Sequence, residues 1–233
     1  MKAVLLRVAI DTRNQGLGPI LRNNSFEYIP ISEDEESIET RRYSNTKGKC
    51  GKFYSDFVKK GYENEKIHFD PEFKTYTYGD FLKKGVLKYL EKGDYLIFYV
   101  GLKSYDSVRQ KKLCIIGYFV VDKIFRYENL QNKKIIDLLK NNAHIKRFLK
   151  QRYMPKDVII IKGSKKSKLL EKAIKIGSHR KRWFFASVKF NKLIGKEKDY
   201  PNGYHLSLSS PREIKGEYAK NLIKWLIKSK KCI

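Results

Sequence analysis

Apolar runs of strand length recur along the chain and predict a protein built around a sheet. The two longest span residues 94–102 and 112–127 and are joined by a polar loop. Because both runs are apolar almost throughout, we expect them to be buried antiparallel strands. Shorter apolar or alternating runs predict further strands at residues 2–10, 73–78, 157–163 and 182–190.

Helical patterns lie between and after these runs. They predict helices at residues 50–60, 81–92, 130–141, 143–152 and 217–231. In the last of these, Tyr218, Leu222 and Trp225 share one face, while lysines line another. Residues 32–39 (SEDEESIE), here called the acidic segment, are expected to form a surface loop. The sequence shows no internal repeats and no Pro/Ser-rich linker. We therefore expect residues 1–233 to form a single α+β domain.

The charge of the chain adds a functional expectation to this pattern. Lys and Arg number 51 against 25 Asp and Glu, a net charge of +26. Residues 140–233 carry 26 basic and 6 acidic residues, a net of +20, and form a more basic C-terminal lobe. Polyanion binding is the commonest use of such a surface, so DNA or RNA is the expected partner. The alternatives are an anionic small molecule or membrane surface, and a Lys-rich, thermophile-like surface, whose ion-pair networks need more acidic residues than this lobe has.

Other features exclude several classes of protein. No run of 18 apolar residues is present, so we expect no membrane span, and residues 1–12 lack the cleavage site of a signal peptide. Three widely spaced cysteines (Cys50, Cys114 and Cys232) argue against a disulfide framework and favour a reducing, cytoplasmic location. Walker A, zinc-finger, nucleophile-elbow and dinucleotide motifs are absent, so no nucleotide triphosphatase is inferred, and the cofactor is left open. Oligomeric state is left open.

The N-terminal segments resemble those of a known family. LLRVAIDT, GLGPIL and SFEYIPI are similar to the start of the nucleotide modification associated domain 3 family, where such a strand precedes a Gly/Pro turn and a Pro-Ile segment. IHFDPEF, TYGD and KGDYLIFYVGL are compatible with the same family, so the resemblance touches much of residues 4–126. It implies a role alongside modification of DNA or RNA bases.

A second resemblance concerns the central strands. GDYLIFY followed by an apolar strand pair is similar to the centre of PUA-like folds, which include the PUA, ASCH, EVE and YTH domains. This resemblance implies a mixed or antiparallel, barrel-like sheet with flanking helices and a pocket for a modified or flipped base. Trp183 and Trp225 lie outside this core segment, so a tryptophan cage for a methylated base is not expected.

Two basic segments are candidates for contact with nucleic acid. In SHRKRWFF (178–185), Arg180, Lys181 and Arg182 can neutralise phosphates, and Trp183 can stack on a base unless its ring belongs to the core. The loop at 162–168 is either an anion-binding nest or a mobile turn. It contains Lys162, Lys165, Lys166 and Lys168. Arg147, on the predicted helix at 143–152, is a further candidate.

Five scattered polar residues could carry chemistry: Arg7, Asp11, His68, Asp70 and His144. His68 and Asp70 would share a face of a strand, and His144 and Arg147 a face of a helix. If the five converged, they could form an acid–base pair with an anion clamp, or a weak metal site. Each one alone is more often structural, as a cap or a hydrogen-bonded side chain.

Three functions are therefore open from sequence. The first is a nucleic-acid-binding module linked to base modification or to recognition of modified bases. The second is an enzyme acting on a nucleotide or a nucleic-acid base through the His, Asp and Arg residues. The third is a structural partner in a ribonucleoprotein, held by the basic lobe. Convergence of the polar residues in a pocket would favour the enzyme.

Overall fold

Two long antiparallel strands form the centre of the fold, as their apolar runs predict. The computed structural model describes residues 1–11, 15–21, 23–81, 85–105, 110–206 and 210–229. In it, β6 (Tyr95–Ser104) pairs antiparallel with β7 (Lys111–Arg126). Both strands are buried over most of their length, and the rings of Phe98 and Phe119 meet edge to face at 4.7 Å. Burial on both faces explains why these runs show no polar alternation.

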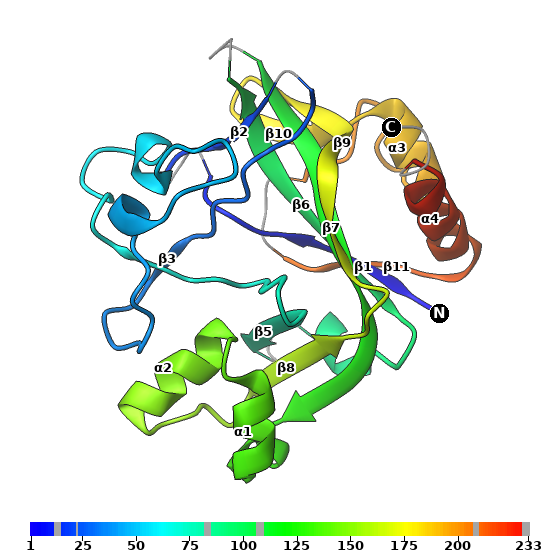
Figure 1. Ribbon diagram of the computed structural model, residues 1–233. Helices are drawn as coiled ribbons and strands as arrows, with labels where there is room; N and C mark the ends of the chain where they lie inside the picture. Colours follow the sequence, from blue (N-terminus) through cyan, green and yellow to red (C-terminus); the bar gives the residue numbers. More distant parts are fainter. Residues whose placement is uncertain (12–14, 22, 82–84, 106–109, 207–209, 230–233) are drawn as a thin grey trace.

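The other strands extend this pair into a mixed sheet of nine strands among the described residues (Figure 1). Along its main path the order is β10-β9-β7-β6-β1-β11, with β1 parallel to β6 and antiparallel to β11. Strands from both ends of the chain therefore lie side by side. The remaining bounds are β1 (Ala3–Arg7), β2 (Gly18–Ile20), β5 (Thr77–Phe81), β8 (Val158–Gly163), β9 (Lys168–Arg180), β10 (Trp183–Ala186) and β11 (Arg212–Ile214).

Strand β7 changes partner along its length. Its first part pairs with β9 and its last part, from Val121 to Arg126, pairs with β8, which in turn pairs with β5. Figure 1 shows β7 curving from one group of strands to the other. The α+β class with a mixed sheet is confirmed. The expectation of a barrel is wrong, because the described strands do not close on themselves, and the PUA-like fold is not confirmed.

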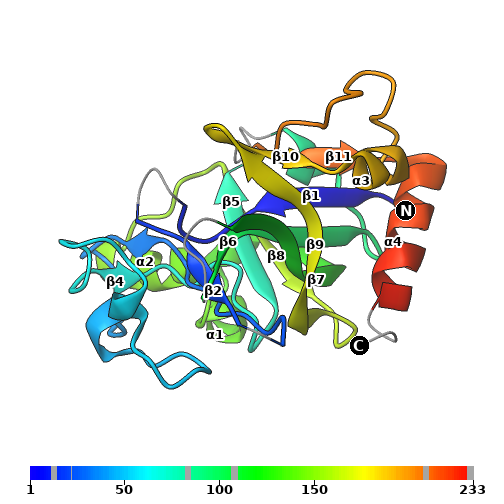
Figure 2. The same ribbon diagram turned by 90° about the horizontal axis from the view of Figure 1, so that it is seen from above.

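Three of the predicted helices are present, with caps that the sequence supplies. They are α1 (Lys133–Leu139), α2 (Ala143–Gln151) and α4 (Gly216–Ser229). The side chains of Asn132 and Asn142 cap α1 and α2 by accepting backbone N–H groups. In both views α3 (Val188–Leu193) and α4 lie on one side of the sheet, and α2 lies toward the other (Figure 2). Within the described chain, no helix is long and apolar enough to cross a membrane.

Several other predicted elements are wrong in part. Residues 50–60 contain one 3-10 turn at Tyr54–Asp56, and 81–92 contain another at Val86–Tyr89, while 82–84 lie outside the described residues. The strand predicted at 73–78 begins only at Thr77, after a turn. The strand predicted at 182–190 ends at Ala186, because Ser187 caps α3. Tyr218 is 51% exposed and does not join the buried face of α4.

Candidate functional site

Three of the predicted polar residues come together: His68, Asp70 and His144. The Nε2 atom of His144 lies 3.3 Å from Oδ2 of Asp70, and Nε2 of His68 lies 3.9 Å from the same oxygen. The two imidazole rings meet edge to face with centroids 5.1 Å apart. All three side chains are largely buried. Two histidines and one carboxylate thus face a common point, and we call them the His–Asp–His cluster.

Two strands neighbouring in sequence and one helix distant from them position these side chains. His68 directly follows β4 (Lys66–Ile67), and its backbone N–H donates to the Ile31 carbonyl. Asp70 is anchored on β5, since both its oxygens accept the Gly79 N–H at 3.0 Å. His144 lies in the first turn of α2. Gly79 leaves room for its ring, because a Cβ there would lie 2.3 Å from Cδ2 of His144.

A buried glutamate, Glu33, binds His68 and Arg147 beside the cluster. Glu33, on β3 (Ser32–Glu33), accepts a hydrogen bond from Nδ1 of His68 at 2.8 Å and two from the Arg147 guanidinium. Burial would raise the pKa of Glu33, but the hydrogen bonds from His68 and Arg147 lower it to about 2. Glu33 is therefore ionised at neutral pH, which fixes the proton of His68 on Nδ1 and leaves Nε2 facing Asp70. Burial raises the pKa of Asp70, an effect that its hydrogen bond with His144 opposes.

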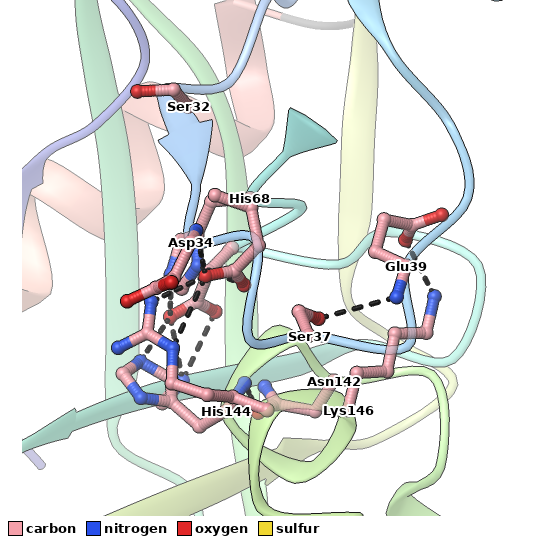
Figure 3. A network of polar contacts seen from close by, with 12 residues as sticks. Ser32, Asp34, Ser37, Glu39, His68, Asn142, His144 and Lys146 are labelled. Carbon is pink, nitrogen blue, oxygen red and sulfur yellow. Dashed lines mark hydrogen bonds and ion pairs between the residues drawn. The ribbon is translucent and has the colours of Figure 1, made fainter. Parts of the chain in front are cut away.

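The acidic segment is docked on α2, so its prediction as a surface loop holds only in part: Asp34, Glu35 and Glu36 are exposed. Glu33, Ser37 and Glu39 are buried. Figure 3 shows Ser37, Glu39 and Lys146 meeting between the segment and the helix, with Oε2 of Glu39 accepting from Nζ of Lys146 at 2.6 Å. Three further contacts join the two: Ile38 N–H to the Lys146 carbonyl, Lys150 Nζ to the Glu35 carbonyl, and Arg147 to Glu33. The segment closes one side of the His–Asp–His cluster.

A pocket opens beside the cluster. It measures about 150 Å³, and its lining includes His144, Arg147, Phe81 and Phe148. A larger depression of about 540 Å³ adjoins it and shares Phe148 among its lining residues. Arg152 and Lys156 line this second space and add positive charge. Together the two spaces offer aromatic surface, cations and a histidine to a ligand.

Arg7 and Asp11 form a second pair. Nη2 of Arg7 lies 4.0 Å from Oδ2 of Asp11. The Arg7 guanidinium also lies over the Phe184 ring and donates to the Leu206 carbonyl at 3.1 Å. These contacts direct Arg7 toward β10, whereas His144 lies on α2. The structure thus brings together three of the five candidate residues, with Arg147 beside His144 along the same pocket, and adds Glu33, which the sequence did not connect with them.

The basic candidates occupy two turns at opposite ends of β9. Lys165, Lys166 and Lys168 are exposed at the turn that precedes the strand, and Lys181 and Arg182 are exposed at the turn that follows it. A strand of 13 residues spans about 40 Å, so the two turns are separate surfaces. Lys162 does not share this exposure, because its Nζ donates to the Thr75 carbonyl and burial lowers its pKa.

The hairpin that joins β9 to β10 contains the remaining candidates. The Arg180 guanidinium lies over the Phe185 ring at 4.9 Å and donates to the Asn202 carbonyl. Trp183 is half-buried and meets the His205 ring edge to face at 4.8 Å. Arg147, proposed above as a nucleic-acid contact, instead binds the buried Glu33 and is 30% exposed. The exposed cations of this hairpin are thus Arg180, Lys181 and Arg182.

Comparison with known proteins gives one match. A family model described as nucleotide modification associated domain 3 matches residues 2–196. That range contains the His–Asp–His cluster, Glu33, Arg147 and both basic turns, and it ends before α4. No curated protein and no solved structure matches.

Proposed function

Since the chain belongs to the nucleotide modification associated domain 3 family, we propose that it modifies a base, with the His–Asp–His cluster as the chemical centre. The base is carried by a free nucleotide or by DNA or RNA. This proposal selects the enzyme from the three functions that the sequence left open.

The observation that carries the proposal is the convergence of His68, Asp70 and His144. His68 and Asp70 lie two positions apart, and His144 lies more than 70 positions further along the chain, yet their ligand atoms lie within 4.8 Å of one another. Here two largely buried histidines face one buried carboxylate, and one of the histidines lines a pocket, which is an arrangement typical of groups that act on a substrate.

The pocket gives each group a role. A base entering beside His144 meets the rings of Phe81 and Phe148, and aromatic faces stack on bases of any sequence. His144 is the member of the cluster that faces the base, Asp70 pairs with it, and Glu33 holds His68 in one tautomer. Arg152 and Lys156 supply charge for a phosphate in the adjoining depression. The pocket alone is smaller than the roughly 300 Å³ usual for a whole ligand, so the sugar and phosphate would extend into that depression.

Mass spectrometry of nucleosides tests this proposal. DNA and RNA from cells that express the parent protein would be digested and compared with those from cells expressing His144→Gln. We expect a nucleoside of changed mass with the parent that is lost with His144→Gln and retained with His179→Gln. His179 lies on β9 and is the matched control. The same nucleoside profile in all three samples, with no nucleotide bound to the purified parent, would refute the proposal.

Binding of the polymer itself is a second candidate function, favoured by the exposed cations at the two ends of β9. Contact with about five phosphates gives a log–log salt slope near −4 on duplex DNA. Replacing Arg180, Lys181 and Arg182 by alanine should weaken binding with little change in the melting temperature, because exposed charges add little stability. Titration against oligonucleotides at several salt concentrations measures this. If the triple variant binds as well as the parent, the hairpin is not the contact surface.

A further inference from the structure

We infer that the His–Asp–His cluster binds one divalent transition-metal ion through Nε2 of His68, Oδ2 of Asp70 and Nε2 of His144. The inference deepens the proposed function, since it concerns the same residues, but metal binding can be measured without any substrate. The sequence suggested at most a weak metal site here, in case the five polar residues converged.

The spacing of the three ligand atoms fits one ion. Zinc lies about 2.0–2.2 Å from histidine nitrogen and carboxylate oxygen, so neighbouring ligand atoms on one ion are about 3–3.5 Å apart. The Asp70 oxygen lies 3.3 Å from His144 Nε2 and 3.9 Å from His68 Nε2. The second distance exceeds a hydrogen bond, and the three atoms all lie within 4.8 Å of one another. Side-chain shifts of about 1 Å or less would bring all three to bonding distance.

The residues behind the cluster are those expected around a metal. A histidine that binds a metal through one nitrogen usually donates its other N–H to a carboxylate, which orients the ring and makes it a stronger ligand. His68 does so with Glu33, and Arg147 in turn holds Glu33. The Asp70 carboxylate is oriented by the Gly79 N–H. A simple ion pair between His144 and Asp70 needs neither a second histidine facing the same oxygen nor the hydrogen bond to Glu33 that orients it.

The ligand set also indicates the class of metal and of site. Two imidazoles and one carboxylate suit Zn²⁺, Fe²⁺, Co²⁺ or Mn²⁺, whereas Mg²⁺ and Ca²⁺ prefer all-oxygen sites. Structural zinc sites are closed by four protein ligands, while catalytic sites keep a position for water or substrate. Here the cluster supplies three ligands, and one of them, His144, lines a pocket of about 150 Å³ together with Arg147. The cluster is therefore open toward the pocket on the His144 side.

Titration of the chelator-treated full chain with Zn²⁺ and with Co²⁺ tests the inference. Calorimetry should show about one ion per chain, and the absorption of bound Co²⁺ should report nitrogen and oxygen ligands. We expect His68→Gln and His144→Gln to lose binding by about 100-fold or more, and Glu33→Gln to weaken it by about 10–100-fold. His179→Gln, which alters one of the other two histidines of the chain, should bind like the parent. Mg²⁺ should not compete.

Two controls keep the outcome clear. Circular dichroism of each variant shows whether it is folded, and Asp70→Asn supplies a third ligand change if a histidine variant unfolds. No binding of either ion by the parent, or equal binding by the parent and by folded ligand variants, would overturn the inference. If the parent binds one ion through these three ligands but changes no nucleoside, the metal site is supported. That result would count only against the proposed function.

Discussion

Replacing Glu39 with glutamine removes a charge that holds the acidic segment on α2. The Glu39 carboxylate accepts from Lys146 at 2.6 Å and from Arg41 at 2.8 and 2.6 Å, and the residue is 5% exposed. Burial would raise the pKa of Glu39, but its hydrogen bonds with Arg41 and Lys146 lower it from 4.5 to about 2. We therefore expect Glu39→Gln to destabilise the folded protein.

The expected loss follows from this pKa. A fall from 4.5 to about 2 corresponds to about 3 kcal/mol of stability at neutral pH. Hydrogen bonds to charged groups contribute about 1.5–3 kcal/mol each, and partial exposure of Arg41 reduces its share. The lowered pKa and the hydrogen bonds thus both give a loss of unfolding free energy of about 3 kcal/mol. For a chain of this length, that loss lowers the melting temperature by about 6–12 °C.

The sign of the pH dependence is fixed by the direction of the shift. Because the folded state lowers the pKa of Glu39, its contribution is fully present above about pH 4.5 and is lost as the pH falls toward 2. The difference between parent and Glu39→Gln should therefore be largest near neutral pH and shrink below about pH 4. Urea unfolding at several pH values measures it.

A matched control is available on the same segment. Glu36 is exposed, so Glu36→Gln should change stability by less than about 0.5 kcal/mol. A double-mutant cycle with Lys146→Met should give a coupling energy of roughly 1–3 kcal/mol between Glu39 and Lys146. If Glu39→Gln is no less stable than Glu36→Gln, or the coupling is zero, the docking contacts do not stabilise the fold and the reasoning fails.

Three further predictions concern other parts of the molecule. Gly79→Ala should displace the His144 ring, since the new Cβ would lie 2.3 Å from it; chemical shifts of His144 that match the parent's would contradict this. Phe184→Ala should lose roughly 3–5 kcal/mol in urea unfolding, because Phe184 is 2% exposed, and Trp183→Ala should lose clearly less; equal losses would place Trp183 in the core. Burial raises the pKa of the Cys114 thiol to about 12, so iodoacetamide at about pH 8 should label it only after denaturation; rapid labelling of the folded protein would be the opposite result.

The sequence predicted the elements whose pattern is regular. The apolar runs of β6, β7 and β8 and the helical spacing of α1, α2 and α4 gave their positions to within a few residues. Strand β9 was missed because its buried residues Leu170, Ala173 and Ile176 recur every third position. Register shifts against β7 interrupt the pairing, so the two-residue period on which strand prediction depends is lost.

For the candidate site, the sequence singled out the three proposed metal ligands but not Glu33, which orients one of them. His68, Asp70 and His144 stood out as residue types suited to chemistry, while Glu33 was one acid in a run that looked solvated. Burial of that run depends on a partner helix more than 100 positions away. The signal that could have found it is the complementary charge of α2, where Lys146, Arg147 and Lys150 lie within one turn of one another.

The docking of the acidic segment on α2 has a consequence for how the protein is made. Its hydrogen bonds join residues 107 and 114 positions apart, such as Glu39 with Lys146 and Glu33 with Arg147. Contacts of such separation form late in folding, since a long loop must close first. A growing chain that ends before residue 144 cannot hold the His–Asp–His cluster, whatever else it has folded. The segment is also held largely by polar contacts, so it can detach at a lower free energy than the core unfolds. Completion of the site is therefore an event distinct from completion of the fold.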